Sequence, residues 1–339
     1  MKILLIQLKR IGDLVLTTPV LAALREKFPD AQVTLVVSSE CAELLPALNG
    51  VDRTLTVERG LKDASAFVAV ARNKFDYCVD FTRNDRSAFL ALLSRGRKRI
   101  VSYRILRRSP LRRRCYNEFV QHRMRDMHTI DYNLSLLQPL GISDASPSIH
   151  LNLPPASLDS ANALLAAASI DRPFVIFHPG SARVEKFWGP HRWANVIDYL
   201  RANWAVKVVL TGGTSELERT HLEEIKTHLR QPIVDFSGKT DLLTLTALIA
   251  QARLLVTVDS APMHLAAATR IPQVILFGPT NPFHWRPREN HALILQGDSS
   301  VPVADFVARQ NRLPMKQIST QTVIDAMDSL LSTPAAQAS

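Results

Sequence analysis

The sequence lacks several features that would assign it to a specialised class. No apolar run approaches the ~18 residues of a membrane-spanning helix, and the start has no signal-peptide pattern, so we expect neither an anchor nor a leader. The three cysteines, Cys41, Cys78 and Cys115, lie far apart without CxxC or metal-ligand spacing, which excludes a disulfide framework and is typical of a reducing cytosol. With 46% hydrophobic and 21% charged residues, the 339-residue chain is globular and long enough for two domains.

Acidic residues are scarce in one stretch of the first half. Residues 1–150 hold 24 Lys or Arg against 15 Asp or Glu, whereas residues 151–339 are almost neutral, with 17 against 16. Within residues 95–125 there are 12 basic residues and one acid, Glu118. A basic block of this density favours an anionic partner: nucleic acid, anionic lipid, or a phosphorylated or carboxylated substrate. The alternative is a solvated, partly mobile loop.

Both halves alternate apolar runs with helical patterns, which predicts parallel sheets covered on both faces. In the first half, a helix at residues 14–28 follows the first strand and its Gly12-Asp13 turn, and a second helix covers residues 87–94. The strands predicted there are residues 2–8, 31–37, 53–57 and 77–81. In the second half, the predicted strands are residues 174–177, 206–210, 254–258 and 273–277. A Pro-rich stretch, residues 146–156, is the expected linker.

Three turns of the second half follow predicted strands and precede predicted helices. They are His178-Pro179-Gly180-Ser181 leading to Lys186, Thr211-Gly212-Gly213-Thr214, and Asp259-Ser260-Ala261-Pro262. Because the carboxyl ends of parallel strands form the ligand edge of open α/β sheets, we expect all three turns at such an edge. Small residues let backbone N–H groups approach an anion, and a helix start adds positive potential. Each turn is also explained by packing and helix capping alone, and neither a Walker A nor a GxGxxG pattern is present.

In the first half, Asp13 lies where the first strand meets the first helix. A carboxylate at this position is either a helix N-cap or a general base that takes a proton from an incoming hydroxyl.

Taken together, these turns resemble glycosyltransferase family nine, the ADP-heptose:lipopolysaccharide heptosyltransferases. The resemblance covers nearly the whole chain and depends on the order and spacing of short motifs. These motifs are Ile11-Gly12-Asp13 with Thr17-Thr18-Pro19, His178-Pro179-Gly180-Ser181 with Lys186 and Trp188, Thr211-Gly212-Gly213, Asp259-Ser260-Ala261-Pro262-Met263-His264 and Phe277-Gly278-Pro279-Thr280.

The resemblance implies the α/β GT-B fold, with two Rossmann-like domains that face a central cleft. Residues 1–150 would bind the acceptor and residues 151–318 the nucleotide sugar, while the final helix, residues 319–333, often crosses back to the N-terminal domain in such enzymes. It also implies an inverting transfer of heptose from ADP-L-glycero-D-manno-heptose to a hydroxyl of the lipopolysaccharide inner core, with no metal and no other cofactor.

The same resemblance implies roles for individual residues. Asp13 matches the catalytic base, and Lys186 matches a catalytic residue that contacts the donor. The implied donor contacts are Ser181 at the diphosphate and sugar, Glu216 at the ribose, Thr240 near the adenine, Asp259 at heptose hydroxyls, Ser260 and Ala261 at the diphosphate, and His264 at the end of its motif.

The basic block then has an expected partner on the acceptor side. The acceptor of the family carries Kdo carboxylates and lipid A phosphates at the inner face of the cytoplasmic membrane of Gram-negative-type bacteria, and arginine suits both groups. We therefore expect a cytoplasmic protein with peripheral membrane contact. The candidate acceptor-binding residues are Arg10, Arg95, Arg97, Arg99, Arg104, Arg112, Arg113 and Arg114.

Two rival interpretations stay open at this stage. The first keeps the GT-B fold but uses another nucleotide sugar, such as a UDP- or GDP-hexose. The second is a basic nucleic-acid-binding protein, which is disfavoured because residues 95–125 contain only two aromatics, Tyr103 and Tyr116, too few for a clear stacking platform. We therefore expect no nucleic-acid partner. The sequence Leu8-Lys9-Arg10-Ile11 before Gly12 departs from the first heptosyltransferase type, which leaves the donor sugar and the acceptor hydroxyl open.

Overall fold

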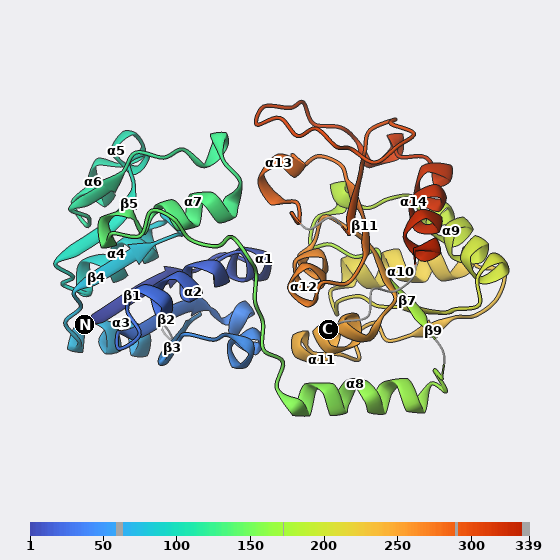
Figure 1. The fold of residues 1–339 in the computed structure, drawn as a ribbon, viewed down its shortest axis with the longest axis horizontal. Coiled ribbons are helices and arrows are strands. Elements are labelled where there is room, and N and C mark those ends of the chain that lie inside the picture. Colours follow the sequence, from blue (N-terminus) through green and yellow to red (C-terminus); the bar gives the residue numbers. More distant parts are fainter. Residues whose placement is uncertain (59–63, 172, 289–290, 334–339) are drawn as a thin grey trace. The chain divides into compact units, whose positions relative to one another are not determined.

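The computed structural model describes residues 1–58, 64–171, 173–288 and 291–333. It divides into two compact units, Met1–Asn152 and Leu153–Ser339. Each unit is built on one six-stranded parallel sheet (Figure 1). No helix in these described ranges is both long enough and apolar enough to span a membrane.

The first sheet has the strand order β3-β2-β1-β4-β5-β6. Its strands are β1 (Lys2–Gln7), β2 (Gln32–Ser38), β3 (Arg53–Val57), β4 (Tyr77–Asp80), β5 (Lys98–Ser102) and β6 (Glu118–Val120). Strand β1 is central, and side chains on both of its faces are fully buried, because Leu4 and Ile6 join one core cluster while Ile3 and Leu5 point to the other face. The helices are α1 (Ile11–Val15), α2 (Thr18–Lys27), α3 (Ala64–Arg72), α4 (Asp85–Leu93), α5 (Ile105–Arg108), α6 (Pro110–Arg113) and α7 (Thr129–Ser135).

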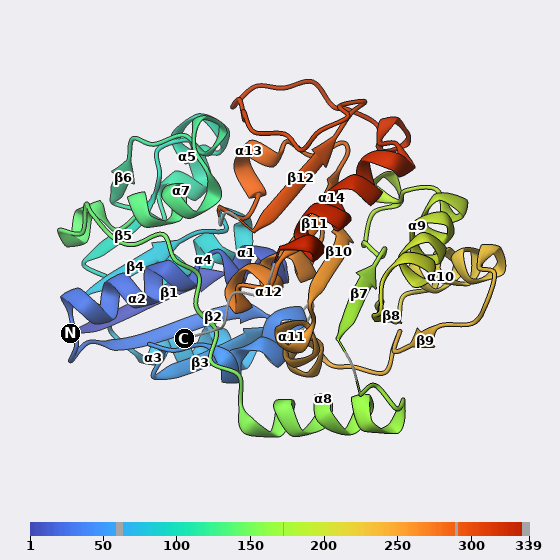
Figure 2. The same ribbon diagram turned by 45° about the vertical axis from the view of Figure 1, so that its right-hand side comes forward.

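The second sheet has the order β12-β11-β10-β7-β8-β9. Its strands are β7 (Phe174–His178), β8 (Lys207–Leu210), β9 (Val234–Asp235), β10 (Leu254–Val258), β11 (Gln273–Phe277) and β12 (Ala292–Gln296). The helices are α8 (Pro155–Ala167), α9 (Pro190–Asn203), α10 (Glu216–His228), α11 (Leu242–Gln251), α12 (Ala261–Thr269), α13 (Pro282–Trp285) and α14 (Thr320–Ser332). Helix α11 packs between α8 and α12, whereas α9 packs with α10 and α14, as Figure 2 shows.

Three local features differ from the sequence expectations. The predicted helix over residues 14–28 is two helices, α1 and α2, because Pro19 lacks the N–H that a continuous helix would donate to Val15. The Thr18 hydroxyl donates to the Val15 carbonyl instead, at 2.9 Å. The expected linker ends at Pro154, since Pro155 opens α8 in the first helical position. The basic block is folded, because β5, α5, α6 and β6 lie within it.

The terminal helix α14 is part of the second unit. Val323, Met327 and Leu331 recur at helical spacing and are buried in the core cluster that contains Val256 of β10 and Trp193 of α9. The carboxylate of Asp328 accepts hydrogen bonds from Tyr199 Oη at 2.6 Å and from Trp204 Nε1 at 2.7 Å. The apolar stripe of α14 is therefore packed on its own unit.

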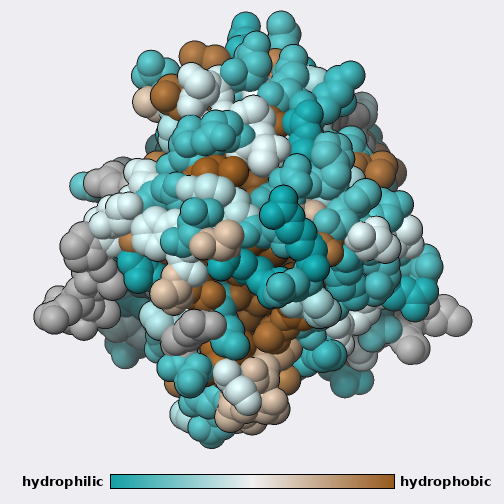
Figure 3. Space-filling view, turned by 90° about the vertical axis from the view of Figure 1, so that its right-hand side faces the viewer, coloured by the Kyte–Doolittle hydropathy of each residue, from teal (hydrophilic) through white to brown (hydrophobic). Residues whose placement is uncertain are grey.

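The face shown in Figure 3 is mostly hydrophilic, with hydrophobic residues in a band through its centre. Large apolar side chains of the second unit that are exposed include Leu158, Val184, Leu217, Val301 and Val307.

Candidate functional site

The carboxyl ends of β7, β8 and β10 lie side by side in the second sheet. Strand β10 pairs with β7 and β7 with β8, all in parallel, so the three predicted turns leave the sheet at one edge. We call this edge, together with its turns, the donor edge. The fold thus brings together residues far apart in sequence, such as Lys186 and Asp259, which are 73 positions apart.

Lys186 and Asp259 form an ion pair at the donor edge. The ammonium Nζ of Lys186 donates to Asp259 Oδ2 at 2.6 Å and to the Asp259 carbonyl oxygen at 2.8 Å. Both side chains are largely buried, with 13% and 8% of their surface exposed. A lysine ammonium carries three N–H donors, so one donor of Lys186 is left for a ligand.

The helix that follows Asp259 begins without a side-chain cap. Ser260 occupies the N-cap position of α12, but its hydroxyl hydrogen-bonds the Val258 carbonyl at 3.3 Å and caps no N–H of the helix. The first turn of α12 therefore keeps its positive potential for a ligand anion. Ala261 is the first residue of this helix and is half-buried, and His264 on the same helix is buried.

Glu218 fills the space between two glycine turns of the donor edge. Its Oε2 atom accepts a hydrogen bond from the Gly213 N–H at 2.6 Å. A Cβ at Gly180 or at Gly213 would lie 2.7 Å from the same oxygen, so a side chain at either position would force the Glu218 carboxylate to move. Glu216 instead has a 76% exposed side chain, ion-paired with Arg219.

The family motif points to Glu216 and does not point to Glu218. The available signal was Ser215-x-x-Glu218, the pattern of a capping box. Half of that box forms, because Ser215 Oγ accepts from the Glu218 N–H at 3.3 Å. The carboxylate of Glu218, however, bonds the Gly213 N–H, which no local pattern specifies.

Two further polar residues are buried at the donor edge. Ser181 is 6% exposed beside the His178 turn. His178 is held by a 3.0 Å hydrogen bond between its Nδ1 and Thr211 Oγ1, and burial lowers the pKa of its imidazole to about 4, so the ring is neutral at pH 7. Thr240 is half-buried in the segment before α11, which is tied to the Gly212 turn through a 2.9 Å bond from the Gly238 N–H to the Gly212 carbonyl.

In the first unit, Asp13 lies in the first turn of α1 with Arg10 at the N-cap, so Asp13 is not the cap. Its Oδ1 atom is buried and accepts no hydrogen bond within the described residues, while Lys9 Nζ lies 3.3 Å away as an ion pair. The Asp13 carbonyl accepts from Thr17 Oγ1 at 2.7 Å and from Gln7 Nε2 at 3.4 Å. The Asp13 carboxylate is thus held beside Lys9, with an Oδ1 atom that accepts no hydrogen bond within the described residues.

The candidate arginines of the basic block are divided by β5. Arg95 and Arg97 precede this strand and Arg99 lies near its start, whereas the other four follow it. Arg99 donates to the carbonyls of Cys115 and Gly96, at 2.8 and 3.0 Å, and Arg95 donates to the carbonyls of Ala71 and Asn73. Since all strands are parallel, these three arginines lie toward the edge of the first sheet opposite to Asp13.

Of the arginines after β5, Arg104 follows the carboxyl end of the strand, toward the same edge as Asp13, and Arg112 reaches this edge at the turn after β4. Arg104, Arg113 and Arg114 are exposed. Arg112 is half-buried, ion-paired with Asp85, and also donates to the Arg83 carbonyl at 3.3 Å.

The comparisons with known proteins bear on both units. The model of glycosyltransferase family 9 (heptosyltransferase) matches residues 65–313. The chain belongs to this family. It is 30% identical over 331 residues to lipopolysaccharide heptosyltransferase 3 of Escherichia coli, covering 94% of this chain and 96% of that protein.

Solved structures share the fold of this family 9 glycosyltransferase. A family 9 glycosyl transferase of Veillonella parvula superposes with a TM-score of 0.84 at 26% identity, covering 98% of this chain and 97% of that one. The E. coli heptosyltransferase WaaC with ADP superposes with a TM-score of 0.70 at 19% identity, covering 98% of each chain. The expected α/β, GT-B fold class is confirmed.

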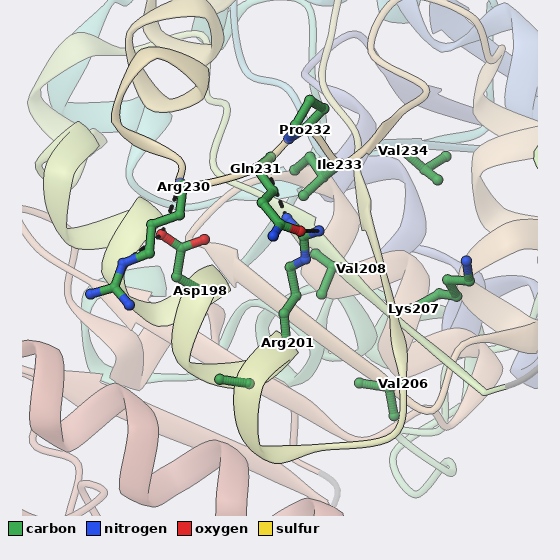
Figure 4. A pocket seen from close by; sticks show the side chains of 11 residues that line it. Asp198, Arg201, Val206, Lys207, Val208, Arg230, Gln231, Pro232, Ile233 and Val234 are labelled. Atoms are coloured by element: carbon green, nitrogen blue, oxygen red, sulfur yellow. Dashed lines mark hydrogen bonds and ion pairs between the residues drawn. The ribbon is translucent and has the colours of Figure 1, made fainter.

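The family 9 protein also has a cavity of about 410 Å³ away from these residues (Figure 4). It lies at the amino end of β8, beside Lys207, and so at the opposite edge of the second sheet from the glycine turns. Its polar groups bind one another: Arg201 donates to the Gln231 carbonyl at 2.8 Å, and the Arg230 N–H donates to Asp198 at 3.1 Å. We therefore leave this cavity out of the candidate site.

Proposed function

We propose that this family 9 enzyme transfers heptose from ADP-L-glycero-D-manno-heptose to a hydroxyl of the lipopolysaccharide inner core, with inversion at the anomeric carbon. The observation that carries the proposal is the buried Lys186–Asp259 pair at the uncapped start of α12. The curated relative is named as a lipopolysaccharide heptosyltransferase, which supports the same substrate class.

The donor side is built to hold a departing diphosphate. Negative charge develops on ADP as the glycosidic bond breaks, and the remaining N–H donor of Lys186 and the first turn of α12 can both stabilise it. We assign Ser181, Ser260 and Ala261 to the diphosphate, Asp259 to sugar hydroxyls, and the segment at Thr240 to the adenine. His264 is the last residue of this set, and it lies on the same helix, α12.

We assign the ribose to Glu218 in place of Glu216. The Glu218 carboxylate lies at two turns of the donor edge, whereas Glu216 points to solvent and pairs with Arg219. A ribose diol offers two O–H donors, and a carboxylate accepts them with charge-assisted hydrogen bonds.

Asp13 is our proposed general base. It would take the proton of the acceptor hydroxyl as that oxygen attacks the anomeric carbon, while the bond to ADP breaks and its electron pair leaves with ADP. The buried Oδ1 of Asp13, which accepts no hydrogen bond within the described residues, is suited to this proton transfer.

On the acceptor side, we propose that Arg10, Arg104, Arg112, Arg113 and Arg114 meet the Kdo carboxylates, the lipid A phosphates or the anionic surface of the inner membrane. Arg95, Arg97 and Arg99 are left for the membrane surface alone, because they lie toward the other sheet edge. The enzyme would then work in the cytoplasm at the inner face of the cytoplasmic membrane.

A donor panel tests the reaction. We expect ADP-heptose to raise the melting temperature and to release ADP when a Kdo-lipid A-type core acceptor is added, while UDP- and GDP-sugars do neither. Lys186→Ala should abolish the donor-induced shift. Lys207→Ala is the matched control, because Lys207 lies at the amino end of β8. Stabilisation by a UDP-sugar, with no response to ADP-heptose, would contradict the proposed donor.

A second experiment tests the acceptor surface. Arg113→Ala/Arg114→Ala should raise the acceptor KM and weaken binding to anionic liposomes, and it leaves the Arg112–Asp85 pair intact. Arg230→Ala/Arg270→Ala removes the same charge from the second unit and should change neither quantity. Unchanged values in both variants would show that these arginines are only solvated, and tighter binding to RNA than to liposomes would favour the nucleic-acid alternative.

A further inference from the structure

Arg83 has an unusual backbone conformation directly after β4. Its φ is +67°, in the left-handed region that favours glycine over residues with a Cβ. An outlier of this kind persists only where its surroundings hold it, and such residues often gather at binding sites. The question is therefore what holds Arg83 and where its side chain lies.

A buried carboxylate holds the backbone of Arg83. Asp80, at the end of β4, is fully buried, and its Oδ1 accepts the N–H groups of Thr82 at 2.7 Å and of Arg83 at 3.1 Å. Its Oδ2 accepts hydrogen bonds from Ser87 Oγ at 2.7 Å and from the Tyr116 hydroxyl. Asp80 is thus fully occupied by these donors, and it fixes the turn from which the Arg83 side chain projects.

The guanidinium of Arg83 has no acidic partner. It lies over the ring of Tyr132, 5.1 Å from the ring centre, and its Nη2 approaches the Met124 sulfur at 3.6 Å. No ion pair among the described residues involves Arg83, although neighbouring Arg112 is paired with Asp85. The Arg83 guanidinium is half-buried and has five N–H donors. Such a group binds best to an anion, such as a carboxylate or a phosphate, that accepts two parallel hydrogen bonds from it.

The position of Arg83 places it on the reactive edge of the first unit. Strand β4 pairs with β1, with Asp80 opposite Ile6, and the Leu8 N–H donates to Thr82 Oγ1 at 2.7 Å. Arg83 therefore comes just after the carboxyl end of β4, and residues 9–13, including Asp13, come just after the carboxyl end of the neighbouring strand β1. The side chain is in the same unit and at the same sheet edge as the proposed base.

We propose that Arg83 binds an anionic group of the acceptor, a carboxylate or a phosphate, beside Asp13. This proposal rests on the proposed function, since it takes the acceptor to be an anionic sugar-lipid. Stacking on Tyr132 keeps the guanidinium oriented, so that the anion meets a preorganised pair of donors.

The test uses Arg83→Gly in the full-length enzyme. Glycine adopts the left-handed backbone without strain, so this variant removes the guanidinium while the turn is kept. We expect acceptor binding, measured by calorimetry with a detergent-solubilised Kdo-lipid A-type core, to weaken about 10- to 100-fold. ADP affinity should not change. Arg83→Lys keeps the charge but loses the paired donors, and its affinity should fall between the two.

Arg270→Gly is the matched control. Arg270 also has a left-handed backbone, with φ of +58°, but is exposed at the end of α12 in the second unit. The same substitution there should leave acceptor binding unchanged. Repeating the measurement with an acceptor whose phosphates have been removed then shows which anion Arg83 binds. If Arg83→Gly still weakens acceptor binding, the anion is a carboxylate. If Arg83→Gly no longer weakens it, the anion is a phosphate.

Equal acceptor affinities of the wild type and Arg83→Gly would overturn the proposal. Because the experiment measures acceptor binding and not heptose transfer, it tests the Arg83 site separately from the proposed reaction. Arg83-dependent acceptor binding without any heptose transfer would contradict the proposed reaction and leave the Arg83 site supported.

Discussion

The Lys186–Asp259 pair allows stability and donor binding to be separated by mutation. Lys186→Met removes the cation and leaves the Asp259 carboxylate, 8% exposed, without its partner. Removing one member of a buried ion pair costs about 3–5 kcal/mol, because the remaining charge is desolvated and uncompensated. The double variant Lys186→Met/Asp259→Asn removes both charges, and replacing a whole pair is about neutral. We therefore expect the single variant to be strongly destabilised and the double variant to recover most of the loss.

Donor affinity should follow a different order. The diphosphate needs the third N–H donor of Lys186, and neither variant has it. We expect ADP binding to be weakened by about 10- to 100-fold in both, as for the loss of a hydrogen bond to a charged group. If the double variant recovers stability but not ADP binding, Lys186 has two separate roles: it neutralises Asp259 in the folded protein, and it donates a hydrogen bond to the diphosphate.

Tryptophan fluorescence is the suitable assay for stability. The four tryptophans of the chain, Trp188, Trp193, Trp204 and Trp285, all belong to the second unit. A urea titration followed by their emission thus measures the unit that holds the pair, and calorimetry with ADP measures binding. The reasoning is refuted if Lys186→Met unfolds within about 1 kcal/mol of the wild type, or if the double variant binds ADP normally.

Three further predictions concern other residues. Asp13→Asn should lower kcat by about 10²- to 10⁴-fold, since an amide cannot act as the base, with unchanged ADP affinity by calorimetry. Glu218→Gln should weaken ADP binding by about tenfold, whereas Glu216→Gln should not. Because the folded pKa of His178 is about 4 against 6.5 for the free group, the unfolded chain binds more protons between these values. The contribution of His178 to stability is full above pH 6.5 and falls by about 3 kcal/mol toward pH 4, and His221, whose pKa burial also lowers to about 4, adds to the loss. Urea titrations across this range measure it.

Each of these has a contrary outcome. Full transfer activity in Asp13→Asn removes Asp13 from the chemistry. Equal effects of the two glutamate variants on ADP affinity would contradict the assignment of the ribose to Glu218. For the imidazole, the control is His178→Gln, which should flatten the loss of stability, and an unchanged pH slope would show that another group is responsible.

The sequence alone determined the fold class and the location of the reactive turns. Strands buried on both faces of a parallel sheet must be continuous apolar runs, and Leu4, Ile176 and Val256 lie in such runs. The polar or glycine-bearing residues that follow these runs must then lie at the carboxyl edge. The order of the short motifs likewise points to the family without any tertiary information. Pro19 also carried the signal for the break between α1 and α2, although the apolar spacing around it favoured one helix.

The partners of individual side chains were decided by the tertiary structure. Lys186 meets Asp259 because β7 and β10 are neighbours, and hydrophobic periodicity does not encode strand order. Glu218 bonds the Gly213 N–H while Glu216 pairs with Arg219, because two residues along a helix turn a side chain to another face. The basic block looks uniform in sequence, yet β5 runs through it and divides its arginines between two edges of the sheet. Local patterns specify where a chain turns, whereas the pairing of distant strands specifies which charges meet there.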